Sequence, residues 1–569
     1  MKKAEALISS VLFEKINTIA PDAVTKADME SMFTVPPDAE MGDLAFACFK
    51  LSKVLRKAPQ MIAQSLCGDF SCDAVERCEA VAGYINFYIS DSFRTDVILG
   101  DILSRGEEYG KIDIGKGKTM VIDYSSPNIA KPFHIGHLGT TAIGNSIKRI
   151  YSFCGYDCIG INHLGDWGTQ FGRLIVAYKK WGSKEAVEQL GVKELARIYK
   201  DFYVEAEKDP SLNDMAKAEF TKIEQGDKEA LELWHWFKDI SLNEFMKTYN
   251  RLGISFESYN GESFYNDKMD RVVNELTQKG LLKESDGAML VDLEEYGMAP
   301  CLILKNDGST LYATRDISAA IYRKENYNFD KCIYVTDAGQ SLHFAQFFKV
   351  IGLMGYDWND KLVHVPYGKI SINGEKLATR TGNVVLLEEL FDDASKRALA
   401  IIEQKNPDLE NKEYIAEKVG IGAVIFNQLS SGRIKDINFV WEEALSFEGN
   451  TGPYVQYTYA RTCSVLSKTE CEDKKLPDGL VLNEDEKALI SILSKFPVKV
   501  EQAHDDYEPS YISRYLLDVC AAYNRFYHNC PILKEEGDVK ALRVALTKAA
   551  NTVIGNGLWL IGLEKTPRI

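Results

Sequence analysis

TMVIDYSSPNIAKPFHIGHLGTTAIGNSIKRI, residues 119–150, contains the local pattern from which the architecture of this chain follows. Its first part, residues 119–124, is an apolar, β-branched run that predicts a strand. Residues 125–128 combine two serines with a proline and an asparagine and predict a turn. From about Pro132 the pattern predicts a helix. The order strand, loop, helix is the unit from which α/β folds are built.

Two histidines stand where that helix is expected to begin. His134 and His137 are three residues apart, so their imidazoles share one face of a helix. A helix N-terminus favours anionic oxygen, because it presents unpaired N–H groups and partial positive charge. Gly136 and Gly139 let a ligand approach the backbone, and Lys131 adds a positive charge. This set of donors suits the stabilisation of negative charge on a phosphate during its transfer.

Other interpretations of the two histidines remain open from spacing alone. A pair of zinc ligands is one, but a catalytic zinc usually has a third protein ligand, and neither an HExxH motif nor a cysteine cluster accompanies the pair. Two ordinary surface histidines are the more common explanation of an isolated His-x-x-His. We therefore expect no protein-bound metal.

Length and composition limit the class of protein. A chain of 569 residues predicts two to four domains, and 45% hydrophobic with 26% charged residues is typical of globular proteins. The N-terminal segment predicts an amphipathic helix, and no stretch is long enough to span a membrane, so no membrane partner is expected. The 12 scattered cysteines predict reduced thiols in the cytoplasm. The net charge of −16 argues against non-specific nucleic-acid binding without excluding a local basic patch.

Further strand and loop units follow the first one. A second strand is predicted at 156–162 and runs into His163 and Asp166; a third, at 332–336, ends in a loop that contains Gln340. Loops at the carboxyl ends of parallel strands open onto a common crevice. We therefore expect an α/β fold with a doubly wound, Rossmann-like parallel sheet. The side chains of the second loop should face the same pocket as the two histidines.

Short strands are predicted between the second and third units. Residues 288–293 and 301–305 are two of them, and a tight turn leads into a third at 309–314, which Tyr312 ends. Asp316 then stands in the first turn of a predicted helix. A carboxylate at that position could serve simply as a helix cap.

The chain divides into three predicted parts. Residues 1–112 combine helices with a small sheet as an α+β domain, and residues 113–390 contain the nucleotide-binding sheet. Residues 183–252 interrupt the second part as a helical insertion without chemistry of its own. Residues 391–569 are helical, and an all-α bundle is expected at about 445–569.

Two segments are candidates for contact with a polynucleotide. In the first part, a basic stripe recurs at helical spacing: Lys50, Lys53, Arg56 and Lys57. From charge alone, a solvated helix face is the more common explanation of such a stripe. In the last part, Tyr454 and Tyr457 share a helix face, where they could also be core residues.

SSPNIAKPFHIGHL, residues 125–138, resembles the signature of class I aminoacyl-tRNA synthetases, and SSPN and AKPFH resemble arginyl-tRNA synthetases in particular. The resemblance extends in order over nearly the whole chain. It implies an N-terminal domain that contacts tRNA, a class I catalytic domain and a C-terminal anticodon-binding bundle. The implied protein is a monomeric arginine–tRNA ligase, which uses ATP with Mg²⁺ to form arginyl-adenylate and then transfers L-arginine to the 3′-terminal adenosine of its tRNA.

The resemblance also implies roles for individual residues. The catalytic residues would be Lys131, His134, His137, Lys376 and Arg380. ATP would be bound by His134, Gly136, His137, Gly139 and Lys376. The arginine pocket would be lined by Ser126, Pro127, Asn128, His137, Glu262, Tyr312, Asp316 and Gln340. Asp316 and Glu262 are its acidic members, as a guanidinium requires, because its planar donors match carboxylates two bonds at a time.

One motif departs from the family pattern. KISINGEKLATRTGNVV, residues 369–385, stands where the family has a lysine-rich KMSKS loop that closes on ATP. The second lysine of that motif is Thr379 here. The charge argument assigns the neutralisation of the departing phosphates to Lys131 and Arg380 instead.

Two other functions remain open from the sequence. One is another nucleotidyltransferase, or a synthetase for a different amino acid. The other is a non-catalytic RNA-binding or regulatory relative of the same fold. The intact histidines and Lys131 argue against the second, because a protein without the chemistry would not need them.

Overall fold

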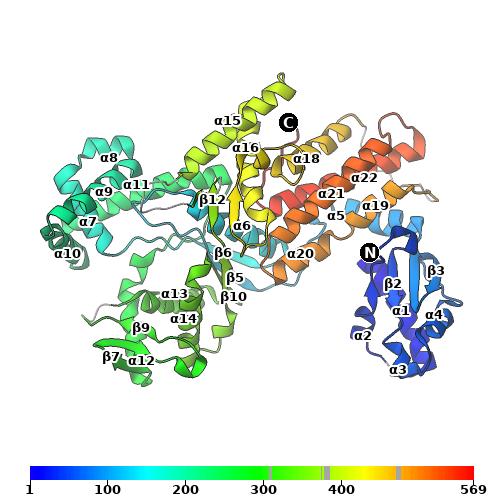
Figure 1. Cartoon of the computed structure of the whole chain (residues 1–569), viewed down its shortest axis with the longest axis horizontal. Helices are drawn as coiled ribbons and strands as arrows, with labels where there is room; N and C mark the ends of the chain where they lie inside the picture. The colour runs from blue at the N-terminus through cyan, green and yellow to red at the C-terminus, as the bar shows by residue number, and fades with distance from the viewer. Residues whose placement is uncertain (23, 307–309, 373–374, 377–384, 470–475, 478) are drawn as a thin grey trace.

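The computed structural model describes residues 1–569 except 23, 307–309, 373–374, 377–384, 470–475 and 478. A four-stranded sheet lies at its centre, in the order β11-β10-β5-β6 (Figure 1). All neighbouring strands are parallel. Its strands are β5 (Thr119–Asp123), β6 (Asp157–Ile161), β10 (Lys331–Asp337) and β11 (Leu362–Tyr367). The chain adds β6 on one side of β5 and then crosses to add β10 and β11 on the other. The strand order therefore reverses between β5 and β10, the position where doubly wound sheets bind ligands.

Helices cover both faces of this sheet. Met120 and Ile122 of β5 pack in one core cluster, with Ile143 of α6 (Leu138–Phe153). Val121 points the other way and packs in a second cluster, with residues of α13 (Tyr312–Tyr327) and α14 (Ser341–Leu353). A strand buried on both faces is apolar throughout, which explains the apolar run in the sequence. The predicted doubly wound parallel sheet is confirmed.

Between β6 and β10 the chain builds two peripheral units. The first is helical: α7 (Thr169–Trp181), α8 (Lys184–Leu190), α9 (Val192–Lys208), α10 (Ser211–Glu224) and α11 (Lys228–Leu252). The second contains η5 (Glu262–Lys268), α12 (Met269–Gln278) and the antiparallel strands β7 (Leu282–Ser285), β8 (Ala288–Val291) and β9 (Cys301–Leu304). Figure 1 shows these units on the same side of the central sheet, one above the other.

Two local predictions are wrong, one at the start of α13 and one at the start of α6. Tyr312 does not end a strand but begins α13, and Thr310 forms only an isolated bridge with Leu304. A short apolar run does not distinguish a strand from the start of a buried helix, and here Ala313 and Thr314 are buried on the helix. The helix expected from Pro132 begins at Leu138, after a 3₁₀ turn at Ile135–His137.

The N-terminal part is an α+β unit, as predicted. Its sheet is antiparallel in the order β1-β2-β4-β3, formed by β1 (Phe33–Thr34), β2 (Leu44–Ala47), β3 (Val75–Val81) and β4 (Tyr84–Ile89). Its helices are α1 (Lys2–Ile19), α2 (Lys26–Glu30), α3 (Leu51–Leu55) and α4 (Pro59–Cys67). The connection to β5 contains η2 (Phe93–Leu99), α5 (Gly100–Arg105) and η3 (Gly106–Glu108). Figure 1 shows this unit well away from the central sheet, next to the C-terminal helices.

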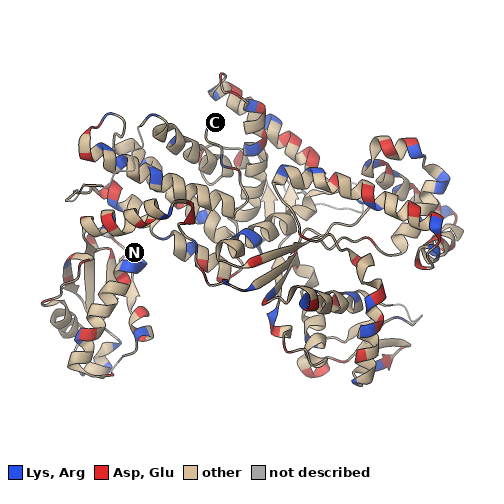
Figure 2. Cartoon of the chain, turned by 180° about the vertical axis from the view of Figure 1, so that it is seen from behind, with Lys and Arg blue, Asp and Glu red and all other residues tan. Residues whose placement is uncertain are grey.

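The C-terminal part is a helical bundle, as predicted. Its helices are α15 (Leu387–Lys405), α16 (Lys412–Ser430), α17 (Trp441–Ala444), α18 (Gly452–Leu466), α19 (Glu484–Leu493), α20 (Phe496–Asp505), α21 (Ser510–Asn529) and α22 (Gly537–Leu560). A small sheet joins it to the catalytic part: β12 (Ile370–Ile372) pairs with β13 (Glu375–Lys376) and β14 (Ile437–Phe439). Acidic and basic residues are mixed along the peripheral helices (Figure 2). Within the described ranges, no helix has the length and apolar character needed to cross a bilayer.

Candidate active site

The loop that follows β5 has an unusual backbone. Ser125, Ser126 and Ala130 have φ angles of 71°, 48° and 60°, a region that favours glycine. Each donates its backbone N–H to a side-chain oxygen of another element: Ser125 to Thr140 Oγ1 (2.9 Å), Ser126 to Asn162 Oδ1 (3.1 Å) and Ala130 to Ser241 Oγ (2.9 Å). The loop at the switch point of the sheet is therefore held in a strained conformation by its surroundings.

The two histidines of this loop fix each other's orientation. The Nδ1 atom of His134 accepts from the N–H of Gly136 at 3.0 Å, and the Nδ1 atom of His137 accepts from the N–H of His134 at 3.2 Å. Their ring centroids are 4.1 Å apart. Because Nδ1 of His134 accepts, the proton of its neutral imidazole lies on Nε2. Nδ1 of His137 also lies 3.2 Å from the carbonyl oxygen of His134, so its contacts fit either tautomer. The site thus presents two neighbouring imidazoles in a fixed arrangement.

Both imidazoles are neutral at physiological pH. Burial, together with the neighbouring His134 and Lys131, lowers the pKa of His137 to about 3. Burial and Lys131 also lower the pKa of His134. Lys131 itself is exposed at the edge of the loop. The positive charge of this site therefore comes from lysine, and the histidines act as uncharged donors.

The two glycines make room for side chains. A Cβ atom on Gly136 would lie 2.7 Å from the ring of His134, and one on Gly139 would lie 2.7 Å from the ring of Tyr367 at the end of β11. The sequence suggested that both glycines serve the approach of a ligand. In the structure they allow the close packing of His134 and Tyr367, which shapes the same corner.

The second predicted chemical loop ends near the histidines. Val385 accepts a hydrogen bond from Ile135 N at 3.0 Å, and Leu387 N donates to Phe133 O at 2.9 Å. The chain is therefore tied to the histidine turn directly after residues 377–384. Lys376 lies in β13, but its side chain is outside the described structure, and Arg380 lies outside the described residues.

An acidic pocket, formed by Glu262, Arg315, Asp316 and His343, lies beside the sheet. Arg315 Nη1 is 3.2 Å from Glu262 Oε2, and His343 Nε2 is 2.6 Å from Asp316 Oδ2. Burial raises the pKa of Glu262 to about 7; Arg315 opposes this shift, and Asp316 and Asp166 add to it. The two carboxylates are thus close enough to repel each other.

Asp316 is not a helix cap. The helix begins at Tyr312, its N-cap residue Leu311 makes no side-chain capping bond, and Asp316 stands in the second turn, where His343 binds it. The alternative in which Asp316 only caps the helix is wrong. Its carboxylate is held by a side chain of α14 instead.

His163 connects the acidic pocket to the loop after β5. Its backbone N–H donates to Ser126 Oγ at 3.2 Å, and Ser126 Oγ donates to Asp123 Oδ1 at 2.8 Å. Asp123 forms a buried ion pair with Arg323, at 2.7 Å. Burial lowers the pKa of His163; the carboxylates of Asp123, Asp316 and Asp166 oppose that shift, whereas Arg323 adds to it. The ring of His163 lies 5.5 Å, centroid to centroid, from that of Tyr265 in η5, the element that also carries Glu262. That His163 faces the same pocket as the two histidines stays a prediction.

Asp166 has a different role from the predicted one. Its side chain is fully buried, 2.6 Å from Lys238 Nζ, and accepts from the backbone and the hydroxyl of Ser263, both at 2.8 Å. These contacts use both carboxylate oxygens. Asp166 therefore fixes the turn that carries Glu262 and does not face the histidines.

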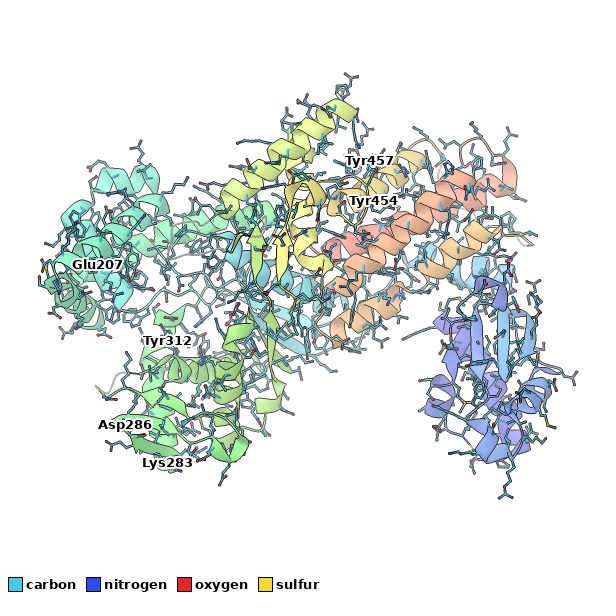
Figure 3. The ribbon with its side chains drawn as sticks, in the orientation of Figure 1. Glu207, Lys283, Asp286, Tyr312, Tyr454 and Tyr457 are labelled. Carbon is cyan, nitrogen blue, oxygen red and sulfur yellow. The ribbon has the colours of Figure 1, made fainter. Side chains whose placement is uncertain are left out.

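The remaining predicted residues lie around the carboxyl edge of the central sheet. Tyr312 is 69% exposed at the start of α13, where Figure 3 shows it on the side of the helical insertion. Gln340 is exposed in the 3₁₀ turn Ala338–Gln340, directly after β10. Pro127 is buried, whereas Asn128 is exposed and forms a bridge with Gly165. The structure thus places all of these residues on loops or helix starts that surround the carboxyl edge of the sheet.

Comparison with known proteins decides the family. The family described as tRNA synthetases class I (R), catalytic domain, matches residues 98–441. An arginine–tRNA ligase of Alkaliphilus metalliredigens is 51% identical over 95% of this chain and 96% of that protein. The chain belongs to the arginyl-tRNA synthetase family.

Other comparisons extend the arginyl-tRNA synthetase match to both ends. The arginyl tRNA synthetase N terminal domain matches residues 6–89, and the DALR anticodon binding domain matches residues 455–569. The arginine–tRNA ligase of Clostridioides difficile is 48% identical over 100% of both chains. The solved arginyl-tRNA synthetase of Thermus thermophilus superposes with a TM-score of 0.77 at 25% identity, covering 100% of both chains.

Several residues of this candidate site have no signal in the sequence. The partners of the two pocket carboxylates, Arg315 and His343, are separated from them by 53 and 27 residues. His364 also lies nearby, bonded to Thr336 Oγ1 at 2.8 Å, and burial lowers its pKa to about 4. Only the position of Arg315 next to Asp316 could have suggested a role.

In the DALR region, the two predicted tyrosines of α18 differ. Tyr454 is partly buried, and its hydroxyl accepts from Asn524 Nδ2 at 3.0 Å. Tyr457 is 37% exposed, and the guanidinium of Arg461 lies 5.1 Å from its ring and 5.2 Å from the ring of Tyr527 (Figure 3). An exposed surface of aromatic rings and arginine is suited to stacking on nucleotide bases.

Proposed function

We propose that this protein is an arginine–tRNA ligase. It activates L-arginine with ATP, as MgATP, to arginyl-adenylate, and then transfers arginine to the 3′-terminal adenosine of its tRNA. The observation that carries the proposal is the combination of two neighbouring imidazoles with a pair of carboxylates, on loops and helices around one sheet. The full-length similarity to arginine–tRNA ligases supports the choice of substrates.

The activation step requires stabilisation of charge on ATP. The carboxylate of arginine attacks the α-phosphorus; a P–O bond to the carboxylate forms, and the bond to the departing pyrophosphate breaks. His134 and His137 donate to the α-phosphate oxygens, with Gly136 and Gly139 keeping the corner compact. Lys131, with Lys376 and Arg380 from the second loop, neutralises the leaving pyrophosphate. No covalent enzyme intermediate is required.

Arginine recognition falls to the acidic pocket and its rim. Glu262 and Asp316 accept hydrogen bonds from the guanidinium, which no amino acid with a neutral or acidic side chain would satisfy. The rest of the substrate is bound by residues that surround the sheet edge: Ser126, Pro127, Asn128, His137, Tyr312 and Gln340. A glutamate substrate would require basic residues in place of the two carboxylates.

tRNA binding uses the outer parts of the chain. We propose the division into residues 1–112, 113–390 and 391–569, in which the first and last parts contact tRNA. The stripe of Lys50, Lys53, Arg56 and Lys57 is exposed around α3, which suits contact with phosphates. Tyr457 and Arg461 provide a stacking surface on the bundle. We place the enzyme in the cytoplasm as a monomer, which sedimentation at assay concentration tests.

The decisive experiment measures attachment of radiolabelled arginine to bulk tRNA by the purified protein. We expect ATP-dependent incorporation of arginine. ATP–pyrophosphate exchange across all amino acids, with and without tRNA, separates this proposal from a synthetase for another amino acid. Exchange that depends on a different amino acid, or no arginine-dependent signal under either condition, contradicts the proposal. Binding of tRNA without any catalysis would indicate a non-catalytic relative.

A further inference from the structure

Each carboxylate of the acidic pocket is already held by a cationic or N–H donor of the protein. Arg315, 13% exposed, lies against Oε2 of Glu262, 18% exposed. His343, 32% exposed, lies against Oδ2 of Asp316, 28% exposed. The two carboxylates come from η5 and α13, and the two donors come from α13 and α14. Three separate elements therefore set the geometry of the pocket.

These contacts occupy one oxygen of each carboxylate. Within the described part of the chain, no hydrogen bond reaches Oε1 of Glu262 or Oδ1 of Asp316. A carboxylate has two acceptor oxygens, and a guanidinium presents parallel N–H groups in a planar fork. One unoccupied oxygen from each of two neighbouring carboxylates matches that donor pattern.

Two buried nitrogen atoms in this region have no hydrogen-bond partner among the described residues. They are Arg315 Nε and His163 Nδ1. Buried polar atoms are normally paired, so an unpaired one needs an explanation, such as a bound water or ion or a role at a functional site. When both carboxyl groups are ionised, they carry two negative charges, and Arg315 supplies one positive charge beside them. A substrate guanidinium would add a second positive charge.

From this geometry we propose that Arg315 and His343 are positioning residues for arginine recognition. Each engages one carboxylate oxygen and so directs the other oxygen, Glu262 Oε1 or Asp316 Oδ1, toward the substrate guanidinium. This inference rests on the proposed function, because it presupposes that the pocket binds arginine. Neither residue contacts the reacting atoms, so each should affect arginine affinity and leave the chemical step largely unchanged.

Substitutions at His343 test the positioning of Asp316. His343→Leu removes the N–H donor, and we expect the KM for arginine in ATP–pyrophosphate exchange to rise tenfold or more, because a bond to a charged group is lost. The kcat and the KM for ATP should stay within twofold. His343→Gln restores an N–H donor at similar reach and should recover the KM to within about threefold. His343→Asn, whose amide is too short to reach, should not.

Substitutions at Arg315 test the positioning of Glu262. Arg315→Met should raise the KM for arginine tenfold or more at pH 7. Three charged groups face Glu262, namely Arg315, Asp316 and Asp166. Asp166 is itself paired with Lys238. Because Arg315 keeps the pKa of Glu262 from rising further, its removal leaves this carboxyl protonated at pH 7. The KM of the variant should therefore fall from pH 7 to pH 9 more steeply than that of the wild type.

A matched control variant and the wild type distinguish failure of the positioning role from failure of the proposed function. Arg271→Met removes an arginine from a surface pair with Glu325, where both side chains are about half exposed (52% and 49%), and should change none of these parameters. Wild-type protein without arginine-dependent exchange would end the proposed function itself. An active wild type whose His343→Leu and Arg315→Met variants keep the KM for arginine, or lose kcat equally, would overturn the positioning role. If either variant unfolds, the comparison of His343→Gln with His343→Asn decides in the same way.

Discussion

Gly165→Ala should weaken arginine binding through a single steric contact. Gly165 lies in the loop after β6, and its Cβ atom would stand 2.0 Å from Asn128 Oδ1, 3.0 Å from Asn128 Cγ and 3.3 Å from Asn128 Cα. Carbon and oxygen atoms do not approach to 2.0 Å without a bond, so something must move. The backbone is clamped on both sides, because Gly165 N donates to Pro127 O at 3.1 Å and Ile129 N donates to Gly165 O at 3.1 Å. The exposed side chain of Asn128 must therefore rotate away.

The size of the effect follows from the hydrogen bond that is lost. An amide oxygen that accepts from a charged group contributes about 1.5–3 kcal/mol, which corresponds to about a tenfold to a hundredfold rise in the KM for arginine. Alanine is compatible with the backbone of residue 165, so the protein should still fold. The assay is arginine-dependent ATP–pyrophosphate exchange, with the KM for ATP as an internal reference that should stay within twofold.

A double-mutant cycle tests the mechanism of this loss. Asn128→Ala alone should raise the KM for arginine about as much as Gly165→Ala. In the Asn128→Ala background the offending atom is gone, so adding Gly165→Ala should cost less than a further twofold. Gly432→Ala is the matched control, because its Cβ atom would meet nothing closer than Glu508 Oε2 at 3.8 Å. Full additivity of the two substitutions, or an unchanged KM in Gly165→Ala, would refute the steric argument.

Three further outcomes are expected. Lys131→Ala should lower the kcat of exchange at least tenfold with little change in the KM for arginine, since it removes charge that the leaving pyrophosphate needs; wild-type turnover would count against this role. Arg323→Met should lower the free energy of unfolding in urea by about 3–5 kcal/mol, because it leaves Asp123 buried without its cation; a loss under 1 kcal/mol would contradict it. The folded state lowers the pKa of His137 from 6.5 to about 3, so the unfolded chain binds more protons and stability should fall as the pH drops from 6.5 toward 3. His137→Asn should flatten that slope, and an unchanged slope would argue against it.

The overall architecture could be predicted from the sequence because the patterns that indicate its strands, turns and helices are local. The middle of β5, Met120 to Ile122, is apolar because both of its faces are covered, and the histidine turn combines a spacing with two glycines that allow close packing. The same reasoning fails where two structures fit one local pattern. Tyr312 follows a short apolar run that suits a strand, but the run packs as the first turn of α13. Asp316 likewise suits a helix cap, and only the position of α14 shows that His343 binds it.

The pairing of charges was not predictable from the sequence at all. Asp166 and Glu262 are both acidic residues in turns that follow apolar segments, and nothing nearby in the chain distinguishes them. In the structure, Lys238 and Ser263 occupy both oxygens of Asp166, whereas Arg315 leaves one oxygen of Glu262 unoccupied. This difference depends on residues more than 50 positions away, and it separates a structural carboxylate from one that is available to a ligand.

The loop after β5 shows why the site depends on the whole domain. Left-handed backbone at serine and alanine costs about 1–3 kcal/mol per residue, and glycine would remove most of that cost. Instead, each strained N–H is held by a side chain from outside the loop, on α6, after β6 or on α11. With glycine at these three positions, the unfolded loop would have more conformations available. The three hydrogen bonds would then have to offset a larger loss of conformational entropy on folding. With serine and alanine, the conformation that directs Asn128 and the histidine turn toward one crevice is reached only when the sheet, α6 and the helical insertion are assembled. The helical insertion therefore helps to set the conformation of this loop through Ser241, a structural contact that is compatible with the prediction that the insertion has no chemistry of its own.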